Sequence, residues 1–202
     1  MKNGLKIKDV VMIALLTALY MVFYMISSAG VTALGAFGHA ISPGICALIA
    51  GSIFLFMTRK VGKFGQFTIL TAICMLLFTM MGAGYLPWLI SSMVCAVIAD
   101  LIASRESKPA VWKVAVASGI MHVGQAWGSI IPSCFFVESY RENWIARGQT
   151  PEAMYEMIRY TQGVMGILAT AVVFILSFAG VYLGYVILKK HLKEERGNMA
   201  KA

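Results

Sequence analysis

Hydrophobic residues along the chain fall into long runs, which short polar or glycine-rich segments separate. A transmembrane helix needs about 20 consecutive, mostly apolar residues. Six runs approach or exceed this length: residues 8–29, 40–57, 64–83, 85–103, 111–135 and 161–188. Two glycines and a proline in GAGYLP, residues 82–87, predict the turn that divides the third run from the fourth. The pattern therefore predicts an all-α integral membrane protein, with residues 1–202 forming one compact domain of six transmembrane helices.

Composition excludes a soluble domain. Hydrophobic residues make up 59% of the 202 residues and charged residues only 13%. A core of this size cannot bury that much apolar surface away from water, so the lipid bilayer is the expected surrounding. The formal net charge of +8 is attributed to cytoplasmic loops, where Lys and Arg gather. No nucleic acid partner is expected.

The positions of the basic residues predict the topology. All but three of the 17 Lys and Arg residues follow an even number of predicted crossings; the three are Arg141, Arg147 and Arg159. Because positive loops stay in the cytoplasm, six spans with both termini in the cytoplasm fit this distribution. An odd number of spans would place basic residues on both sides.

The one long outer connection covers residues 136–160 and predicts two short helices. The first ends near Gly148, and the second begins with Thr150 as N-cap and Pro151 at the first helical position. The apolar face of the second helix allows it to continue into the sixth span. Two interpretations stay open: an amphipathic loop on the membrane surface, or a lid over an outward-facing site.

Motifs for catalysis are not found, so no enzyme activity and no cofactor are expected. The sequence contains no GxxxxGK[ST] phosphate cradle and no HExxH metal site. Ser118 and His122 share a helix face, but no third catalytic group or oxyanion site accompanies them. The four cysteines have no CxxC spacing and are interpreted as packing residues, not metal ligands. Asp100, near the cytoplasmic end of the fourth span, is expected to pair with Arg105, Lys108 or Lys113.

Polar residues in the fifth span predict a ligand site. His122, Gln125 and Ser129 recur at intervals of three and four residues, so they line one helix face. Trp127 lies between them in sequence. Polar side chains at membrane depth normally face a cavity or a neighbouring helix. Helix–helix hydrogen bonding is therefore the alternative to a binding role.

Further polar and aromatic residues are expected at the same depth, near the outer face. Trp88, Ser91 and Ser92 open the fourth span, Gln162 opens the sixth, and His39 lies in the glycine-rich loop GAFGHAISPG. Individually, the aromatic residues fit an interfacial belt. Together, the set predicts a small outward-facing pocket with aromatic walls and a few polar anchors, as small-molecule sites usually have.

The first span carries two alanines one helical turn apart. Ala14 and Ala18 have the small-xxx-small spacing that lets helix backbones approach closely. Gly124–Gly128 and Gly180–Gly184 have the same spacing and are assigned to packing inside the protein. The alanine pair follows a short basic N-terminus, in the sequence IALLTALYMV.

Over its whole length the sequence resembles the S components of energy-coupling-factor (ECF) transporters, nearest the MptD or Trep_Strep branch. The likeness includes GAFGHAISPG, VIADLIAS and ESYRENWIARGQTPEAMYEMI. The resemblance implies a multi-pass protein of the bacterial plasma membrane that binds a vitamin or another small micronutrient near the outer face. It implies that Ala14 and Ala18 face a membrane T component, and that two cytosolic ATPases supply the energy. The loaded subunit would then tilt in the bilayer to deliver its substrate.

Two other functions are weighed against this one. A self-sufficient secondary transporter would need a deep titratable or ion site and usually has inverted repeats, neither of which is clear in the sequence. A non-transport membrane interaction or regulatory protein is compatible with Ala14 and Ala18 alone.

Overall fold

The computed structural model describes residues 4–104 and 109–199 and is built from helices, with no strand among these residues. Helices satisfy every backbone polar group within one segment, as the bilayer interior demands. The elements are α1 (Ile7–Val31), the 3₁₀ turn η1 (Thr32–Leu34), α2 (Gly35–Lys60), α3 (Gln66–Met80), α4 (Leu86–Ala103), α5 (Val111–Phe135), α6 (Val137–Ile145), α7 (Pro151–Thr161) and α8 (Gly163–Met199). The all-helical prediction is confirmed.

Five of the described helices are long and apolar enough to cross a membrane: α1, α2, α4, α5 and the 163–189 part of α8. The predicted third span corresponds to α3, which is apolar but has only 15 residues. The predicted start of the second span at residue 40 is wrong. Instead α2 begins at Gly35, whose positive φ of 60° lets the chain turn directly out of η1. The glycine-rich segment that was predicted as a loop is therefore helical.

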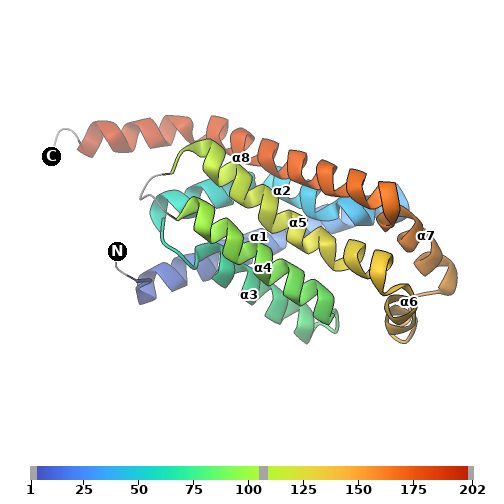
Figure 1. The fold of residues 1–202 in the computed structure, drawn as a ribbon. Helices are drawn as coiled ribbons and strands as arrows, with labels where there is room; N and C mark the ends of the chain where they lie inside the picture. The colour runs from blue at the N-terminus through green and yellow to red at the C-terminus, as the bar shows by residue number, and fades with distance from the viewer. Residues whose placement is uncertain (1–3, 105–108, 200–202) are drawn as a thin grey trace.

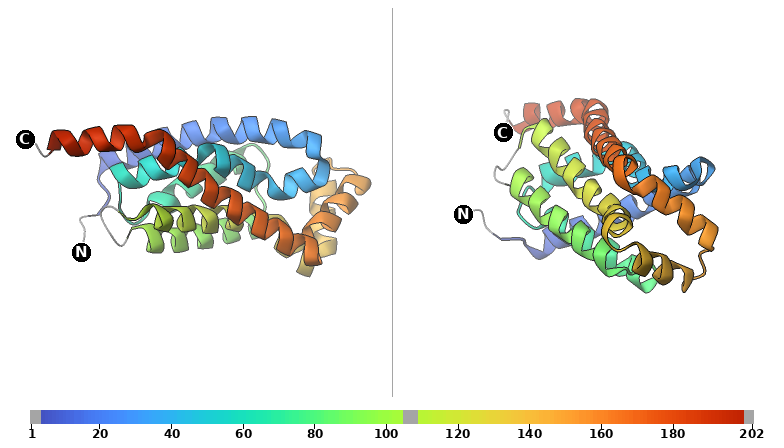
Figure 2. Two further views of the ribbon diagram at one scale, coloured as in Figure 1. Left: turned by 90° about the horizontal axis from the view of Figure 1, so that it is seen from above. Right: turned by 45° about the vertical axis from the view of Figure 1, so that its right-hand side comes forward.

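The helices form an elongated bundle with distinct ends. In Figure 1, α1 begins and α8 ends at the same end of the bundle, while α6 and α7 lie at the other. The two views in Figure 2 agree on this separation. The most buried of the long helices are α2 and α5, and α2 packs on α1, α5 and α8. The end that carries α6 and α7 is called the α6–α7 end below.

Glycines bring α2 and α8 into close contact. A Cβ added to Gly51 would lie 2.0 Å from the carbonyl carbon of Gly180, and one added to Gly184 would lie 2.5 Å from the Cα of Ser52. Backbone atoms cannot move aside as a flexible side chain can, so these positions accept only glycine at this separation. In α5, Gly124 is covered by Cys95 and Gly128 by Trp88. The internal packing role predicted for both glycine pairs is confirmed.

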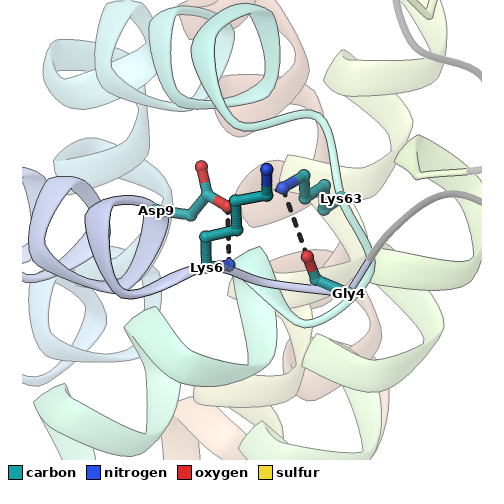
Figure 3. Close-up of polar contacts among 4 residues, drawn as sticks. All are labelled: Gly4, Lys6, Asp9 and Lys63. Carbon is teal, nitrogen blue, oxygen red and sulfur yellow. Dashed lines mark hydrogen bonds and ion pairs between the residues drawn. The ribbon is translucent and has the colours of Figure 1, made fainter.

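At the end of the bundle opposite α6 and α7, charged groups tie the start of the chain to the α2–α3 connection (Figure 3). The Lys63 Nζ lies 2.6 Å from Asp9 Oδ2 and donates a hydrogen bond to the Gly4 carbonyl. The same Asp9 oxygen accepts a 2.8 Å hydrogen bond from the backbone N–H of Lys6. Asp9 therefore caps the first turn of α1 and fixes it beside the α2–α3 connection.

Asp100 has a structural role that the sequence analysis did not predict. Its carboxylate is fully buried and receives hydrogen bonds from the backbone N–H groups of Phe67 and Thr68 at 3.0 and 2.9 Å, and from the Thr68 hydroxyl at 2.7 Å. Asp100 thus caps the N-terminus of α3, where unpaired N–H groups carry a partial positive charge. Of its expected partners, Arg105 and Lys108 lie outside the described residues.

The connection of residues 136–160 folds into two short helices, as predicted. Thr150 caps α7 by accepting a hydrogen bond from the Ala153 N–H at 3.2 Å, and Pro151 is the first helical residue. Gly148 has a left-handed φ of 96° after α6. However, α7 does not run into α8, because Gln162 is extended and Gly163 has a φ of 56°. The Thr161 hydroxyl, at the end of α7, bonds the Ser133 hydroxyl of α5 at 2.7 Å.

Candidate functional site

A pocket of about 160 Å³ lies beneath α6, toward the α6–α7 end of the bundle. Residues from α1, α2, α3, α4, α5 and α6, together with the α3–α4 turn, form its wall. The lining residues are Tyr24, His39, Ala40, Ser42, Pro43, Phe78, Ala83, Tyr85, Trp88, Gln125, Ala126, Gly128, Ser129, Tyr140 and Trp144. The volume matches a single small ring system, since an engineered protein cavity of about 150 Å³ holds benzene.

Four of the predicted site residues line this pocket: His39, Trp88, Gln125 and Ser129. Gln125 and Ser129 come from one face of α5, as their spacing predicts, and Trp88 lies over Gly128 of the same helix. His39 comes from the first turns of α2. Its carbonyl would bond the residue four positions on, but this is Pro43, which has no N–H; the Ser42 hydroxyl donates to that carbonyl instead, at 2.9 Å.

His122 does not line the pocket but lies behind Gln125. Its Nε2 is 3.2 Å from the Tyr20 hydroxyl, and its Nδ1 is 2.7 Å from the Ser118 carbonyl oxygen. The Tyr20 hydroxyl in turn lies 3.4 Å from Gln125 Nε2. All three side chains are at least nine-tenths buried. His122 and Tyr20 therefore support Gln125 from behind and do not face the space in the pocket.

The remaining predicted site residues lie elsewhere. Ser91 donates to the Gly124 carbonyl at 2.8 Å and so joins α4 to α5, while Ser92 is fully buried. Trp127 faces an apolar groove between α4, α5 and α8 and bonds the Thr170 hydroxyl at 3.2 Å. Gln162 is exposed and lines a separate groove with Arg141 and Arg159, at the α6–α7 end of the bundle.

The sequence analysis missed the aromatic residues that cover the pocket. Tyr85 lies at the start of α4, and Tyr140 and Trp144 lie on α6. The Tyr85 ring centroid is 5.6 Å from that of Tyr140 and 6.3 Å from that of Trp144. These residues stand in or beside loops, where no helical spacing links them to α5, so the sequence gives them no shared face.

One arginine fastens the cover to the rest of the bundle. Arg147, just after α6, donates hydrogen bonds to the carbonyl oxygens of Gly82 and Gly84 in the α3–α4 turn, at 3.1 and 2.7 Å. Its guanidinium also lies 5.2 Å from the Trp144 ring centroid, within the range of a cation–π contact. Arg147 thus joins the end of α6 to the α3–α4 turn, in addition to the ring contacts that Tyr85 makes with α6.

Comparison with known proteins identifies the family. The family described as hypothetical bacterial integral membrane protein, Trep_Strep, matches residues 7–194. The chain belongs to this family. No curated protein and no solved structure matches the chain. The family description and the apolar helices together make this Trep_Strep protein a multi-pass integral membrane protein.

The pocket of this Trep_Strep protein has one imidazole, His39, and no acidic or strongly basic side chain (Asp, Glu, Lys or Arg) among the described residues of its wall. Burial raises the pKa of Tyr140, and the neighbouring Tyr85 raises it further. Burial also raises the pKa of Tyr85, although Arg147 opposes this shift. Both phenols therefore stay protonated at physiological pH, and neither adds a charge to the site.

The site in this Trep_Strep protein is suited to reversible binding. Six of its 15 described lining residues are Phe, Tyr or Trp, and a few uncharged polar groups supply direction. Among the described residues, no three His, Cys, Asp or Glu side chains converge as metal ligands, and all four cysteines are free thiols. The arrangement can hold a small neutral molecule by ring contacts and hydrogen bonds.

Proposed function

We propose that this protein is the substrate-binding subunit, or S component, of an ECF-type importer for a vitamin or another small micronutrient. In this proposal it works with a membrane T component and two cytosolic ATPases. The observation that carries the proposal is the aromatic pocket under α6, in a multi-pass membrane protein of the Trep_Strep family. Substrate enters from the outer face, and the partner subunits supply the energy.

The proposal includes six crossings with both termini in the cytoplasm. As an α-helix of 15 residues, α3 spans about 22 Å, less than the roughly 30 Å hydrocarbon core. A crossing by α3 would therefore require local thinning of the bilayer or polar ends close to the interface. An even number of crossings requires both termini on one side. In support of this, α1 begins and α8 ends at the same end of the bundle (Figure 1). The basic residues near this end support its placement on the cytoplasmic side, because Lys and Arg gather in cytoplasmic loops.

The proposed partner surface is the exposed face of α1. Ala14 and Ala18 are both exposed, and the large apolar residues around them, such as Leu15 and Leu19, are 64% and 46% exposed. By contrast, the buried glycines of α2 and α8 already pack against the backbone of the other helix. Ala14 and Ala18 thus form a small-residue surface on which no described helix packs. A partner helix needs such a surface for close approach.

Native mass spectrometry of the purified protein tests the binding function. We expect a retained small molecule on the wild-type protein and its loss on Gln125→Ala, because the variant removes a polar group from the pocket wall. The cost in binding free energy should be about 1–3 kcal/mol, which is the price of leaving a buried ligand group unpaired. Gln162→Ala is the matched control, since Gln162 lies outside the pocket.

Two results would contradict the proposal. A wild-type protein that carries no small molecule after purification from bacterial membranes would argue against a substrate-binding subunit. The other is a Gln125→Ala variant that folds poorly, while the fraction that does fold binds the ligand with unchanged affinity. That result would assign Gln125 to helix–helix hydrogen bonding. Thermal unfolding of both variants, measured alongside binding, separates the two roles.

A further inference from the structure

The hydrogen bonds behind the pocket determine which nitrogen of His122 carries the proton. His122 Nδ1 lies 2.7 Å from the Ser118 carbonyl oxygen, which can only accept, so Nδ1 must be protonated and donate. The more distant Ser118 hydroxyl, at 3.5 Å, cannot reverse this assignment. A doubly protonated, charged ring would be costly here, because the ring is fully buried and no carboxylate is among its hydrogen-bond partners. Nε2 is therefore an acceptor.

The protonation of His122 in turn determines where the Tyr20 hydroxyl donates its proton. The Tyr20 hydroxyl is 3.2 Å from the Nε2 acceptor and has a single proton, which it donates there. Its oxygen is left to accept, and the nearest donor is Gln125 Nε2 at 3.4 Å. Gln125 Oε1 lies 3.5 Å from the same hydroxyl, but no proton remains for it. The Gln125 amide nitrogen is therefore the donor to Tyr20, and the amide oxygen receives no proton from Tyr20, so it can accept one from a ligand.

The two serines of the pocket wall also present acceptors. Ser42 donates its hydroxyl proton to the His39 carbonyl at 2.9 Å, and Ser129 donates its proton to the Ala126 carbonyl at 3.0 Å. Because carbonyl oxygens only accept, both hydroxyl protons are committed within their own helices. Each serine oxygen keeps lone pairs for a bound molecule.

A donor is left over on the covering helix. The indole Nε1 of Trp144 is buried and has no hydrogen-bond partner among the described residues. A buried donor without a partner is unfavourable. The oxygens described above on α2 and α5 are thus acceptors, while Trp144 on α6 keeps an unpaired donor; the rings of Tyr24, His39, Tyr85 and Trp88 add further polar groups to the wall.

From these contacts we propose that the pocket selects an uncharged aromatic heterocycle by its N–H donor, which Gln125 Oε1 accepts. Tyr20 and His122 are positioning residues that hold the Gln125 amide in this orientation. The inference rests on the proposed binding function and narrows its substrate class to neutral molecules with an N–H edge.

Indole and benzofuran provide a matched pair of probes, because they have the same ring size and differ in the N–H group. We expect purified wild-type protein in detergent to bind indole about three- to tenfold more tightly than benzofuran, the effect of one net hydrogen bond. Tyr20→Phe frees the Gln125 amide to rotate, so this preference should fall below about twofold. Tyr182→Phe, which removes a hydroxyl from the exposed side of α8, should retain the preference.

An equal affinity of the wild-type protein for the two probes would overturn the proposal. So would a Tyr20→Phe variant that folds and keeps the full preference for indole. Binding of neither probe would count against an aromatic binding pocket, and hence against the proposed function itself. The positioning of Gln125 by Tyr20 and His122 would then be tested by a measurement that needs no ligand.

That measurement is ¹⁵N NMR of the His122 ring, assigned in a His39→Asn, His191→Asn variant that retains only His122. The ring should show protonated Nδ1 and unprotonated Nε2. A ring protonated at Nε2 would remove the basis for the Gln125 orientation, whatever the probes bind. The result also holds if Tyr20→Phe fails to fold, because the NMR variant leaves the network intact.

Discussion

Buried polar residues in this protein separate into those that hold helices together and those that face the pocket. Asp100 belongs to the first group, because its carboxylate receives three hydrogen bonds from the first turn of α3. Gln125 belongs to the second and is itself held by Tyr20. The depth of a polar residue in the membrane therefore does not indicate its role; the role follows from where its hydrogen bonds go.

Some of the site residues predicted from helical spacing line the pocket, and others lie outside it. Gln125 and Ser129 are four residues apart and share the pocket face. Trp127, two residues from Gln125, is turned by about 200° and lies on another face. Ser91 and Ser92 have the right depth, but they serve α4 packing. Sequence gives the period of a helix, whereas the neighbouring helices decide which face lines a cavity.

Asp100→Asn should destabilise the protein without changing the pocket. The amide keeps one acceptor oxygen but places its NH₂ group against the N–H of either Phe67 or Thr68, so at least one hydrogen bond to α3 is lost. We expect the free energy of unfolding to fall by about 1–3 kcal/mol, measured by chemical denaturation in detergent. Glu138→Gln is the control, since this exposed residue pairs only with Arg141 among the described residues and should change stability by at most about 0.5 kcal/mol. Equal effects of the two variants would show that Asp100 does not stabilise α3.

At the scale of elements, the long apolar helices were the most predictable part. The predicted fifth span, 111–135, coincides with α5, and the caps of α7 follow from Thr150 and Pro151. The start of α2 and the separation of α7 from α8 were not predicted, because glycines at 35 and 163 take left-handed conformations that a hydropathy pattern does not register. A lid was one of two interpretations of residues 136–160, but the contacts of α6 with the pocket could not be predicted, since they join segments far apart in sequence.

Arg147 should control the opening of this cover. Arg147→Ala removes both hydrogen bonds to the α3–α4 turn and the contact with Trp144. We expect amide hydrogen exchange in α6 to accelerate by about tenfold, as for a local opening made about 1.4 kcal/mol easier, while exchange in α2 and α5 is unchanged. Arg141→Ala is the matched control, because Arg141 pairs with Glu138 inside the same helix. If both variants exchange alike, the Arg147 contacts do not hold α6 in place.

At the scale of the whole molecule, three pairs of small residues with the same spacing have different surroundings. Gly180 and Gly184 pack on α2, Gly124 and Gly128 pack under α4, and Ala14 and Ala18 remain exposed. The spacing alone makes the three pairs equivalent, and only the assembled bundle shows which one is unfilled. The exposed pair on α1 is therefore the site at which the proposed assembly with a T component is best tested.

The central claim is tested by purifying the chain from native bacterial membranes and identifying by mass spectrometry what accompanies it. The wild-type protein should bring down a membrane T component and two ATPases. Ala14→Trp combined with Ala18→Trp should lose all three and still carry its small molecule, because the bulky rings block close helix approach without disturbing the buried core. Leu183→Trp with Ile187→Trp, on the exposed face of α8, is the control and should keep them. If the wild-type protein brings down no such subunits, or if the Ala14 and Ala18 variant retains them in full, the protein does not couple to an ECF module through α1.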